Sequence, residues 1–353
     1  MKTFLDEIKE QSAALLRLND EYYAKPPVWL DGIERLLRDK AFDSVIFSGM
    51  GSSLFAGHYA AMFLREHGVK ATAMESYELQ SHGGVLLDEK KLLVAISQSG
   101  ESEELVDLVQ SGVHKGKLVV VTNYDQSTLS NYGDVKLLIH AGKELTTATK
   151  SYTNTLAAVI GLAAALCGKY TELTPVFNEN INKLASVIDD FIYKRSDEIE
   201  SIGNMLMNAK WVPLVASGAS YVTASHAELV LEEAAKIYCS RFTLGQFIHG
   251  PIETIDENLC AIVFDFNPAM RDRVDRVLSA CSRFNGSAVL FTNRSDDFSA
   301  LYNGVTAVKI EIDDPYFAVI AEIVPIELSV NYAGFKKGLT PGILTRVRKI
   351  VGA

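Results

Sequence analysis

Short apolar runs alternate along this chain with segments of helical period. In the first half, runs typical of buried strands fall at residues 44–48, 71–75, 92–97, 117–122 and 135–139. Helical patterns lie at 54–67 and 103–113, and an apolar, alanine-rich helix is predicted over 151–167. Strands that alternate with helices in this way predict a parallel sheet with helices on both faces, an α/β fold.

The second half repeats the pattern. Its predicted strands are 211–216, 260–265, 287–291 and 305–311, and its predicted helices are 221–239, 268–284 and 317–337. Two stretches therefore read as copies of one unit. The first copy ends its second strand in Ser97-Gln-Ser-Gly-Glu-Ser102, where the second copy has Phe264-Asp-Phe-Asn-Pro-Ala269. A duplicated scaffold with one polar loop indicates a small-molecule enzyme whose ligand is anchored by the first copy.

A chain of 353 residues predicts two domains. We expect an N-terminal helical segment over 1–40 and a first domain over 41–175. A charged helical connector over 176–208 then leads to a second domain with a C-terminal tail over 209–353. The four cysteines are scattered and form no C-x-x-C pair, so they are predicted to be buried thiols of a cytoplasmic protein: Cys167, Cys239, Cys260 and Cys281.

Charge and hydropathy exclude several partners. The net charge is −10 and no basic block occurs, which argues against nucleic acid. No apolar run has the length of a membrane span, and the first residues form an amphipathic pattern without the apolar core of a signal peptide. A phosphorylated substrate stays compatible with an acidic protein, because backbone amides can create a local positive site.

The loop Ser97–Ser102 is the strongest candidate for such a site. It follows a buried strand and precedes a helix, so it lies beside free N–H groups and the positive end of the helix dipole. Gly100 allows the backbone to approach a ligand closely. The alternative is that Ser99 or Ser102 merely caps the helix. The small residues 51–53 at the preceding strand end favour a phosphate site.

Three further features are weaker by themselves. Residues 143–150 bring hydroxyls to the start of the alanine-rich helix, and the alternative is a capped loop. Glu233 borders the apolar face of a helix and could exchange protons near neutral pH, or it could be a solvated surface residue. His249 lies in a turn with Gly-Pro and could be a general acid or base, or purely structural.

Together these pieces resemble the sugar isomerase (SIS) domain family over nearly the whole chain. The likeness is to its double-domain members, among them the fructosamine-6-phosphate deglycases and the isomerase half of glucosamine-6-phosphate synthase. Ser97-Gln98-Ser99-Gly-Glu-Ser102 resembles the family's S-Q-S-G-E-T phosphate loop, and Gly51-Ser52-Ser53 resembles its G-T-S turn. Thr147-Ala-Thr149-Lys150 is similar to A-S-T-K, and Glu233 with His249-Gly-Pro251 matches K-E-x…G-E-x-x-H-G-P.

The resemblance implies two flavodoxin-like, three-layer α/β/α domains and a homodimer with a shared active site. It implies that the serine loops hold the phosphate of a 6-phosphosugar, that Glu233 moves a proton between C1 and C2, and that His249, from the neighbouring subunit, opens the ring. In the C-terminal tail, Arg346 aligns with a lysine that reaches the site, and Lys349 is the next candidate. No metal or organic cofactor is expected.

Two departures shape the expected reaction. A glutaminase domain with its nucleophilic cysteine is missing from this sequence, which argues against glutamine-dependent amination. Val230 also stands where the synthase pattern has a lysine three residues before Glu233. We therefore expect a deglycase of C1-amino-ketose 6-phosphates. A ketose–aldose phosphate isomerase, an amino-sugar-phosphate deaminase and a non-catalytic phosphosugar sensor remain alternatives.

Overall fold

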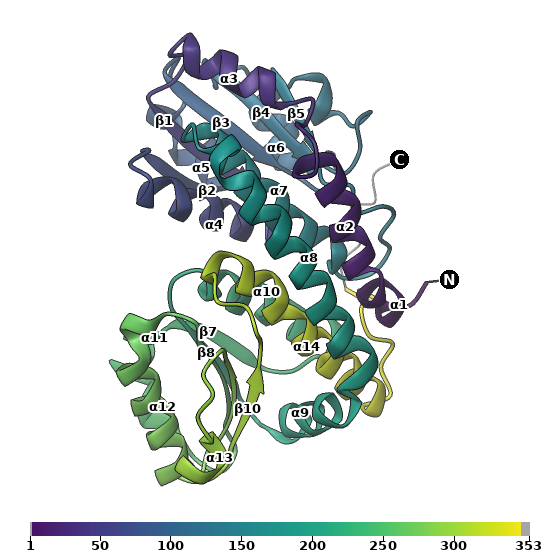
Figure 1. The fold of residues 1–353 in the computed structure, drawn as a ribbon, viewed down its shortest axis with the longest axis vertical. Coiled ribbons are helices and arrows are strands. Elements are labelled where there is room, and N and C mark those ends of the chain that lie inside the picture. Colours follow the sequence, from purple (N-terminus) through teal and green to yellow (C-terminus); the bar gives the residue numbers. More distant parts are fainter. Residues whose placement is uncertain (1, 347–353) are drawn as a thin grey trace. The chain divides into compact units, whose positions relative to one another are not determined.

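The computed structural model describes residues 2–346 and divides into two compact units (Figure 1). The N-terminal unit comprises residues 10–182, and the C-terminal unit comprises residues 2–9 and 183–346. The chain passes between the units at Lys9–Glu10 and again within helix α8 (Tyr170–Lys194). Each unit has its own sheet and its own core.

The N-terminal unit is built on a five-stranded parallel sheet in the order β2-β1-β3-β4-β5. Its strands are β1 (Ser44–Gly49), β2 (Ala71–Glu75), β3 (Lys91–Ile96), β4 (Lys117–Thr122) and β5 (Val135–Leu138). This is the strand order of flavodoxin-like folds. The central strands β1, β3 and β4 are almost wholly buried, because their valine, leucine and isoleucine side chains meet helices on both faces.

Helices α4 and α7 cover one face of this sheet, and α5 and α6 cover the other (Figure 1). The helical elements of this unit, besides the first part of α8, are α2 (Gln11–Tyr22), α3 (Leu30–Arg38), α4 (Ser52–Glu66), α5 (Ser76–His82), α6 (Glu103–Gln110), α7 (Lys150–Leu166) and the 3-10 turns η1 (Gly84–Leu86) and η2 (Leu129–Asn131). All 17 residues of α7 are buried, since it packs against α2, α3 and α4.

The C-terminal unit repeats the same topology. Its parallel sheet has the order β10-β9-β8-β6-β7, which is the first sheet's order read from the opposite edge. The strands are β6 (Val212–Ala216), β7 (Cys239–Thr243), β8 (Cys260–Asp265), β9 (Ser287–Thr292) and β10 (Val305–Lys309). The predicted α/β fold with two flavodoxin-like three-layer domains and parallel sheets is therefore confirmed.

Helix α12 lies on one face of the second sheet, and α10 and α14 lie on the other (Figure 1). The helical elements of this unit, besides the last part of α8, are α1 (Phe4–Lys9), α9 (Ser196–Asn208), α10 (Ser220–Ala235), α11 (Leu244–Ile248), α12 (Arg271–Arg283), α13 (Phe298–Leu301), α14 (Pro315–Lys336) and the 3-10 turns η3 (Pro251–Thr254) and η4 (Pro268–Met270).

The sequence prediction was wrong at the end of one helix. The helix predicted over 221–239 stops at Ala235, because Lys236 takes a left-handed conformation with φ 52°. Residues 239–243 then form β7, an edge strand that was not predicted. Its side chains are partly or fully exposed, so the strand lacks the apolar run of the buried strands.

Helix α14 is long and apolar enough to cross a membrane by length and composition, but 89% of its most apolar window is buried inside the fold. Such burial is typical of a core helix. The helix nevertheless carries Glu322, whose side chain is fully buried and accepts a hydrogen bond of 2.7 Å from the Ser220 hydroxyl. Its second carboxyl oxygen has no hydrogen-bond partner. Burial raises the pKa of Glu322 to about 7.

Glu322 should make stability depend on pH. Above the usual glutamate pKa of 4.5 the unfolded chain releases this proton, while the folded protein keeps it up to about pH 7. The free energy of unfolding should therefore fall as pH rises from about 4.5 to about 7 and then level off. Glu322→Gln should remove this decline and make the protein up to about 3 kcal/mol more stable at pH 8.

Urea unfolding of both proteins across that pH range measures the effect. Glu311→Gln is the matched control, because the Glu311 side chain is 71% exposed. Parallel stability curves for wild type and Glu322→Gln would contradict the assignment.

Candidate active site

The carboxyl ends of β1 and β3 define the candidate site in the N-terminal unit. These strands are parallel neighbours, yet the chain leaves β1 toward β2 on the opposite side, so the edge between them is the topological switch point of the sheet. A Cβ added at Gly49 would lie 2.8 Å from the Ile96 carbonyl and 2.9 Å from Cβ of Ser53. Glycine at this position therefore lets the two strand ends and the start of α4 lie together.

The first polar turn on this edge consists of Gly51, Ser52 and Ser53. Gly51 has φ 50°, a left-handed conformation that favours glycine, and it directly precedes α4. No side chain caps the helix, and its first turn contains no acidic residue. Ser52 and Ser53 are half-buried. The turn thus combines a helix N-terminus with two hydroxyls, which suits an anion.

The second polar turn is the loop Ser97–Ser102, named the serine loop below. Ser97 and Ser99 are only 2% and 5% exposed. The hydroxyls of Ser97 and Ser102 are 2.8 Å apart, and the amide of Gly100 donates to the Ser97 hydroxyl at 3.0 Å. Ser102 precedes α6 but its side chain does not cap the helix. Ser102 therefore does not act as a simple side-chain cap of α6, which was the alternative to a phosphate site.

Gln98 carries a donor that the protein leaves unused. Its side-chain nitrogen is buried and has no hydrogen-bond partner. Burying a polar group without a partner costs free energy, so such groups often mark sites that a ligand completes. The backbone oxygen of Gln98 accepts a hydrogen bond of 3.1 Å from the amide of Asn123, which joins the serine loop to the turn after β4.

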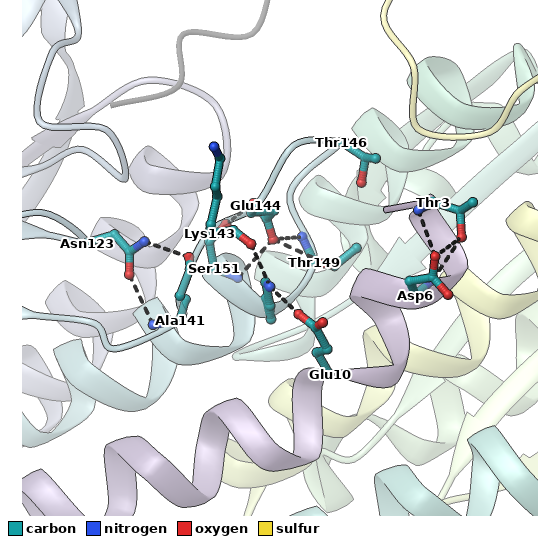
Figure 2. A network of polar contacts seen from close by, with 12 residues as sticks. Thr3, Asp6, Glu10, Asn123, Ala141, Lys143, Glu144, Thr146, Thr149 and Ser151 are labelled. Atoms are coloured by element: carbon teal, nitrogen blue, oxygen red, sulfur yellow. Dashed lines mark hydrogen bonds and ion pairs between the residues drawn. The ribbon is translucent and has the colours of Figure 1, made fainter. Parts of the chain in front are cut away.

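The start of α7, by contrast, already holds an anion from the chain itself. The fully buried carboxylate of Glu144 accepts hydrogen bonds from the amides of Thr149 and Ser151 at 3.0 and 3.1 Å (Figure 2). Their hydroxyls donate to the same carboxylate at 3.1 and 2.5 Å. This is the capped-loop alternative for residues 143–150, while a substrate contact by Thr149 stays a prediction. An acidic residue shortly before a helix start was the overlooked sequence signal.

The loops after β4 and β5 are tied to each other as well. The Asn123 side chain accepts from the amide of Ala141 at 3.0 Å and donates to the Gly142 carbonyl at 2.8 Å (Figure 2). Lys150, at the start of α7, is buried, pairs with the carboxylate of Glu10 and donates to the carbonyl of Lys143. Hydrogen bonds thus connect successive loops along this edge of the sheet.

An ion pair between Asp265 and Arg294 occupies the equivalent edge of the second copy. Asp265 ends β8, has a fully buried side chain, and accepts a hydrogen bond of 3.1 Å from Arg294. Arg294 also contacts Asp275 at 2.8 Å and Asp296 at 2.9 Å. Burial raises the pKa of Asp265, with the Arg294 guanidinium opposing the shift. A buried carboxylate that is already paired with an arginine of the chain thus occupies this position, where the first copy has serine hydroxyls.

The predicted proton-transfer residues lie in the C-terminal unit. Glu233 is half-buried on α10 and is bordered by the buried side chains of Val230 and Ala234. His249 is exposed at the end of α11, which begins with a capping box of Thr243. Arg346 is exposed, and Lys349 lies outside the described residues. Glu233, His249 and Arg346 therefore belong to a different unit from the serine loop.

Two lysines that the sequence analysis missed lie at the end of α10. Lys236 donates to the backbone carbonyl of Glu233 at 2.5 Å, and Lys337 donates to the carbonyls of Ala235 and Lys236 at 2.8 and 3.2 Å. Burial lowers the pKa of Lys337. Amino groups thus lie close to the backbone around Glu233, although Val230 itself is fully buried. Lys337 follows the end of α14, far from Glu233 in the sequence, so only the three-dimensional structure could reveal its position.

The cysteines in the described part of the chain are free thiols, and two of them, Cys260 and Cys281, are buried. All four cysteines are free, and burial raises the thiol pKa of Cys260 to about 11 and of Cys281 to about 12. Within residues 2–346, no group of three or more His, Cys, Asp or Glu residues is arranged to hold a metal ion.

Comparisons with known proteins agree with this architecture. A Legionella pneumophila (strain Paris) protein named glutamine–fructose-6-phosphate aminotransferase (isomerizing) is 26% identical over 291 residues, which are 82% of this chain and 47% of that protein. The chain thus spans about half the length of the curated relatives it matches.

Two solved structures share the fold. The C-terminal domain of glucosamine-fructose-6-phosphate aminotransferase from Francisella tularensis has a TM-score of 0.86 at 19% identity and covers 96% of this chain and 97% of that one. Tagatose-6-phosphate ketose/aldose isomerase from Escherichia coli has a TM-score of 0.80 at 20% identity, with 99% and 97% covered.

The SIS domain family model matches the chain twice, over residues 37–165 and 205–321. The two segments fall one on each unit and contain both candidate serine turns, Glu233 and His249. Since they cover well over half of the chain, this protein belongs to the SIS domain family.

Proposed function

We propose that this chain is an enzyme that acts on 6-phosphosugars and binds their phosphate at the two serine turns. The observation that carries the proposal is the serine loop at the switch point of the first sheet. Its hydroxyls leave the start of α6 uncapped, and Gln98 beside them holds an unused buried donor. The names of the similar proteins, which refer to 6-phosphosugars, support the same class of ligand.

Within this class, we infer that the reaction is the removal of an amine from a C1-amino-ketose 6-phosphate. After ring opening assisted by His249, Glu233 takes a proton from C1 while the C2 oxygen is protonated, which gives an enaminol. Protonation at C2 then gives an imine. Water adds to C1 of the C=N bond to give a carbinolamine, the C1–N bond then breaks, and the products are an aldose 6-phosphate and the free amine. A positioned carboxylate is sufficient for each proton transfer.

The main argument for a deglycase is the residue pattern around Glu233. Val230 occupies the position of the expected lysine and is fully buried, so no amino group stands there. The competing proposal is a ketose–aldose isomerase, which the likeness to the tagatose-6-phosphate isomerase favours. Lys236 at the end of α10 would be the first lysine to test under that alternative.

Ser102→Ala should weaken binding of fructose 6-phosphate by about 10- to 100-fold, the effect of losing one charge-assisted hydrogen bond. Its stability should change little, because the Ser102 side chain does not cap α6. Isothermal calorimetry measures the affinity. Ser111→Ala, at the other end of α6, is the control and should bind as the wild type does. Unchanged affinity in Ser102→Ala would exclude the serine loop as the phosphate site.

The reaction itself is tested with two substrates. A C1-amino-ketose 6-phosphate should yield free amine and hexose 6-phosphate, and Glu233→Gln should lower this rate by at least about 100-fold, as for loss of a general base. Fructose 6-phosphate should be isomerised slowly or not at all. Amine detection and a coupled glucose 6-phosphate assay follow the two reactions. Fast isomerisation without amine release from any ketosamine phosphate would establish the isomerase alternative instead.

We also propose that two chains share their active sites. His249 is exposed in the single chain, as a side chain that serves a neighbouring subunit would be. Mixing inactive Glu233→Gln and His249→Ala proteins should then restore up to about a quarter of the activity, because mixed dimers would contain one intact site. Activity after mixing and sedimentation velocity are the measurements. A fully active monomer would refute the shared site.

A further inference from the structure

The serine loop contains a negative charge, which is unexpected beside a phosphate. Glu101 lies between Gly100 and Ser102, within the motif that we propose to bind the anion. A carboxylate near a bound phosphate repels it by simple electrostatics. Its presence therefore requires a compensating role, and its contacts indicate one.

Both oxygens of the Glu101 carboxylate accept a hydrogen bond from one residue of the neighbouring turn. One oxygen accepts from the backbone amide of Thr128 at 2.7 Å, and the other accepts from the Thr128 hydroxyl at 2.6 Å. Thr128 directly precedes the 3-10 turn η2. Both bonds are charge-assisted and short, so they are among the stronger contacts that an acidic side chain can make. They join two segments that are 27 residues apart in the sequence.

Two backbone hydrogen bonds and one close approach also join the serine loop to residues 123–129. The amide of Leu129 donates to the carbonyl of Gly100 at 3.1 Å, and the amide of Asn123 donates to the carbonyl of Gln98 at 3.1 Å. Gly100 has φ 68°, and a Cβ there would lie 2.0 Å from the Ser127 hydroxyl oxygen. The loop therefore packs directly against residues 123–129, and among these contacts only those of Glu101 involve a carboxylate.

The backbone of Glu101 links this contact to the serines. Its amide donates to the Ser99 hydroxyl at 3.1 Å, and the Gly100 amide donates to the Ser97 hydroxyl at 3.0 Å. When the Glu101 side chain is fixed on Thr128, the amides of residues 100 and 101 and the two serines are fixed as well. A preorganised set of donors binds an anion more tightly than a mobile one.

We infer that Glu101 is a positioning residue, which holds the serine loop in its anion-binding conformation by fixing it to Thr128. The inference rests on the proposed function, since it assigns the same loop to phosphate. It also predicts the direction in which phosphate affinity changes when Glu101 is neutralised. If the carboxylate acted only through its charge, its neutralisation would strengthen phosphate binding. If it acts by positioning, neutralisation weakens binding in spite of the favourable change in charge.

The test measures affinity for fructose 6-phosphate and for inorganic phosphate by calorimetry. Glu101→Gln should weaken both by about tenfold, the effect of one lost charge-assisted bond. Glu103→Gln is the matched control, because Glu103 is an exposed residue in the first turn of α6 and the same charge is removed. This control should bind as tightly as the wild type or slightly more tightly.

A second pair of variants addresses folding. Thr128→Val removes the hydroxyl that donates to Glu101 and should weaken phosphate binding as well. Thr128→Ser keeps both the hydroxyl and the amide donor, so its affinity for phosphate should equal that of the wild type. Hydrogen exchange at residues 99–102 should accelerate in Glu101→Gln and in Thr128→Val but not in Thr128→Ser. A role in stability alone would shift the unfolding temperature and leave the affinity of the folded protein unchanged.

The outcomes separate the two proposals. Wild-type protein that binds neither ligand would overturn the phosphate site and, with it, the role of Glu101. Wild-type protein that binds both, with equal or tighter binding by Glu101→Gln and Thr128→Val, would overturn the role of Glu101 and leave the phosphate site standing.

Discussion

The pairing of β1 with β3 is the constraint on which the candidate site depends. Because the two strands are parallel neighbours, the turns after Gly49 and Ile96 emerge on one edge of the sheet. The absence of a side chain at Gly49 lets the first turn of α4 approach that edge. The strand order brings these turns together, and the contacts between them then fix their conformation. These contacts include the pair of serine hydroxyls and the hydrogen bonds from Thr128 to Glu101.

Much of the fold could be read from the sequence, since buried parallel strands have a strong local signal. The predicted strand at 260–265 coincides with β8, and that at 117–122 coincides with β4. Edge strand β7 escaped because its residues are partly exposed and polar, so they lack the apolar run that marks a strand buried on both faces. The end of α10 was also not predicted, because a left-handed conformation is not expected of a lysine such as Lys236.

Only those parts of the site whose residues are adjacent in the sequence could be predicted. Hydroxyls and glycines clustered at a strand end identify the serine loop, because the motif and the element boundary are adjacent in sequence. The partners of the carboxylates are not local. Which donors Glu101 and Glu144 accept from, and that Asp265 meets Arg294, depends on how separate loops fold against each other. Sequence periodicity carries no information on such side-chain partners.

The ion-paired edge of the second copy has a consequence for how the duplicated chain responds to its surroundings. There, Asp265 is paired with Arg294 of the same chain, and the Arg294 side chain is only 14% exposed, which shelters the pair from dissolved ions. Two units of one topology thus differ in what stabilises this strand end: an ion pair within the chain in one, and a bound ligand, under the proposed function, in the other.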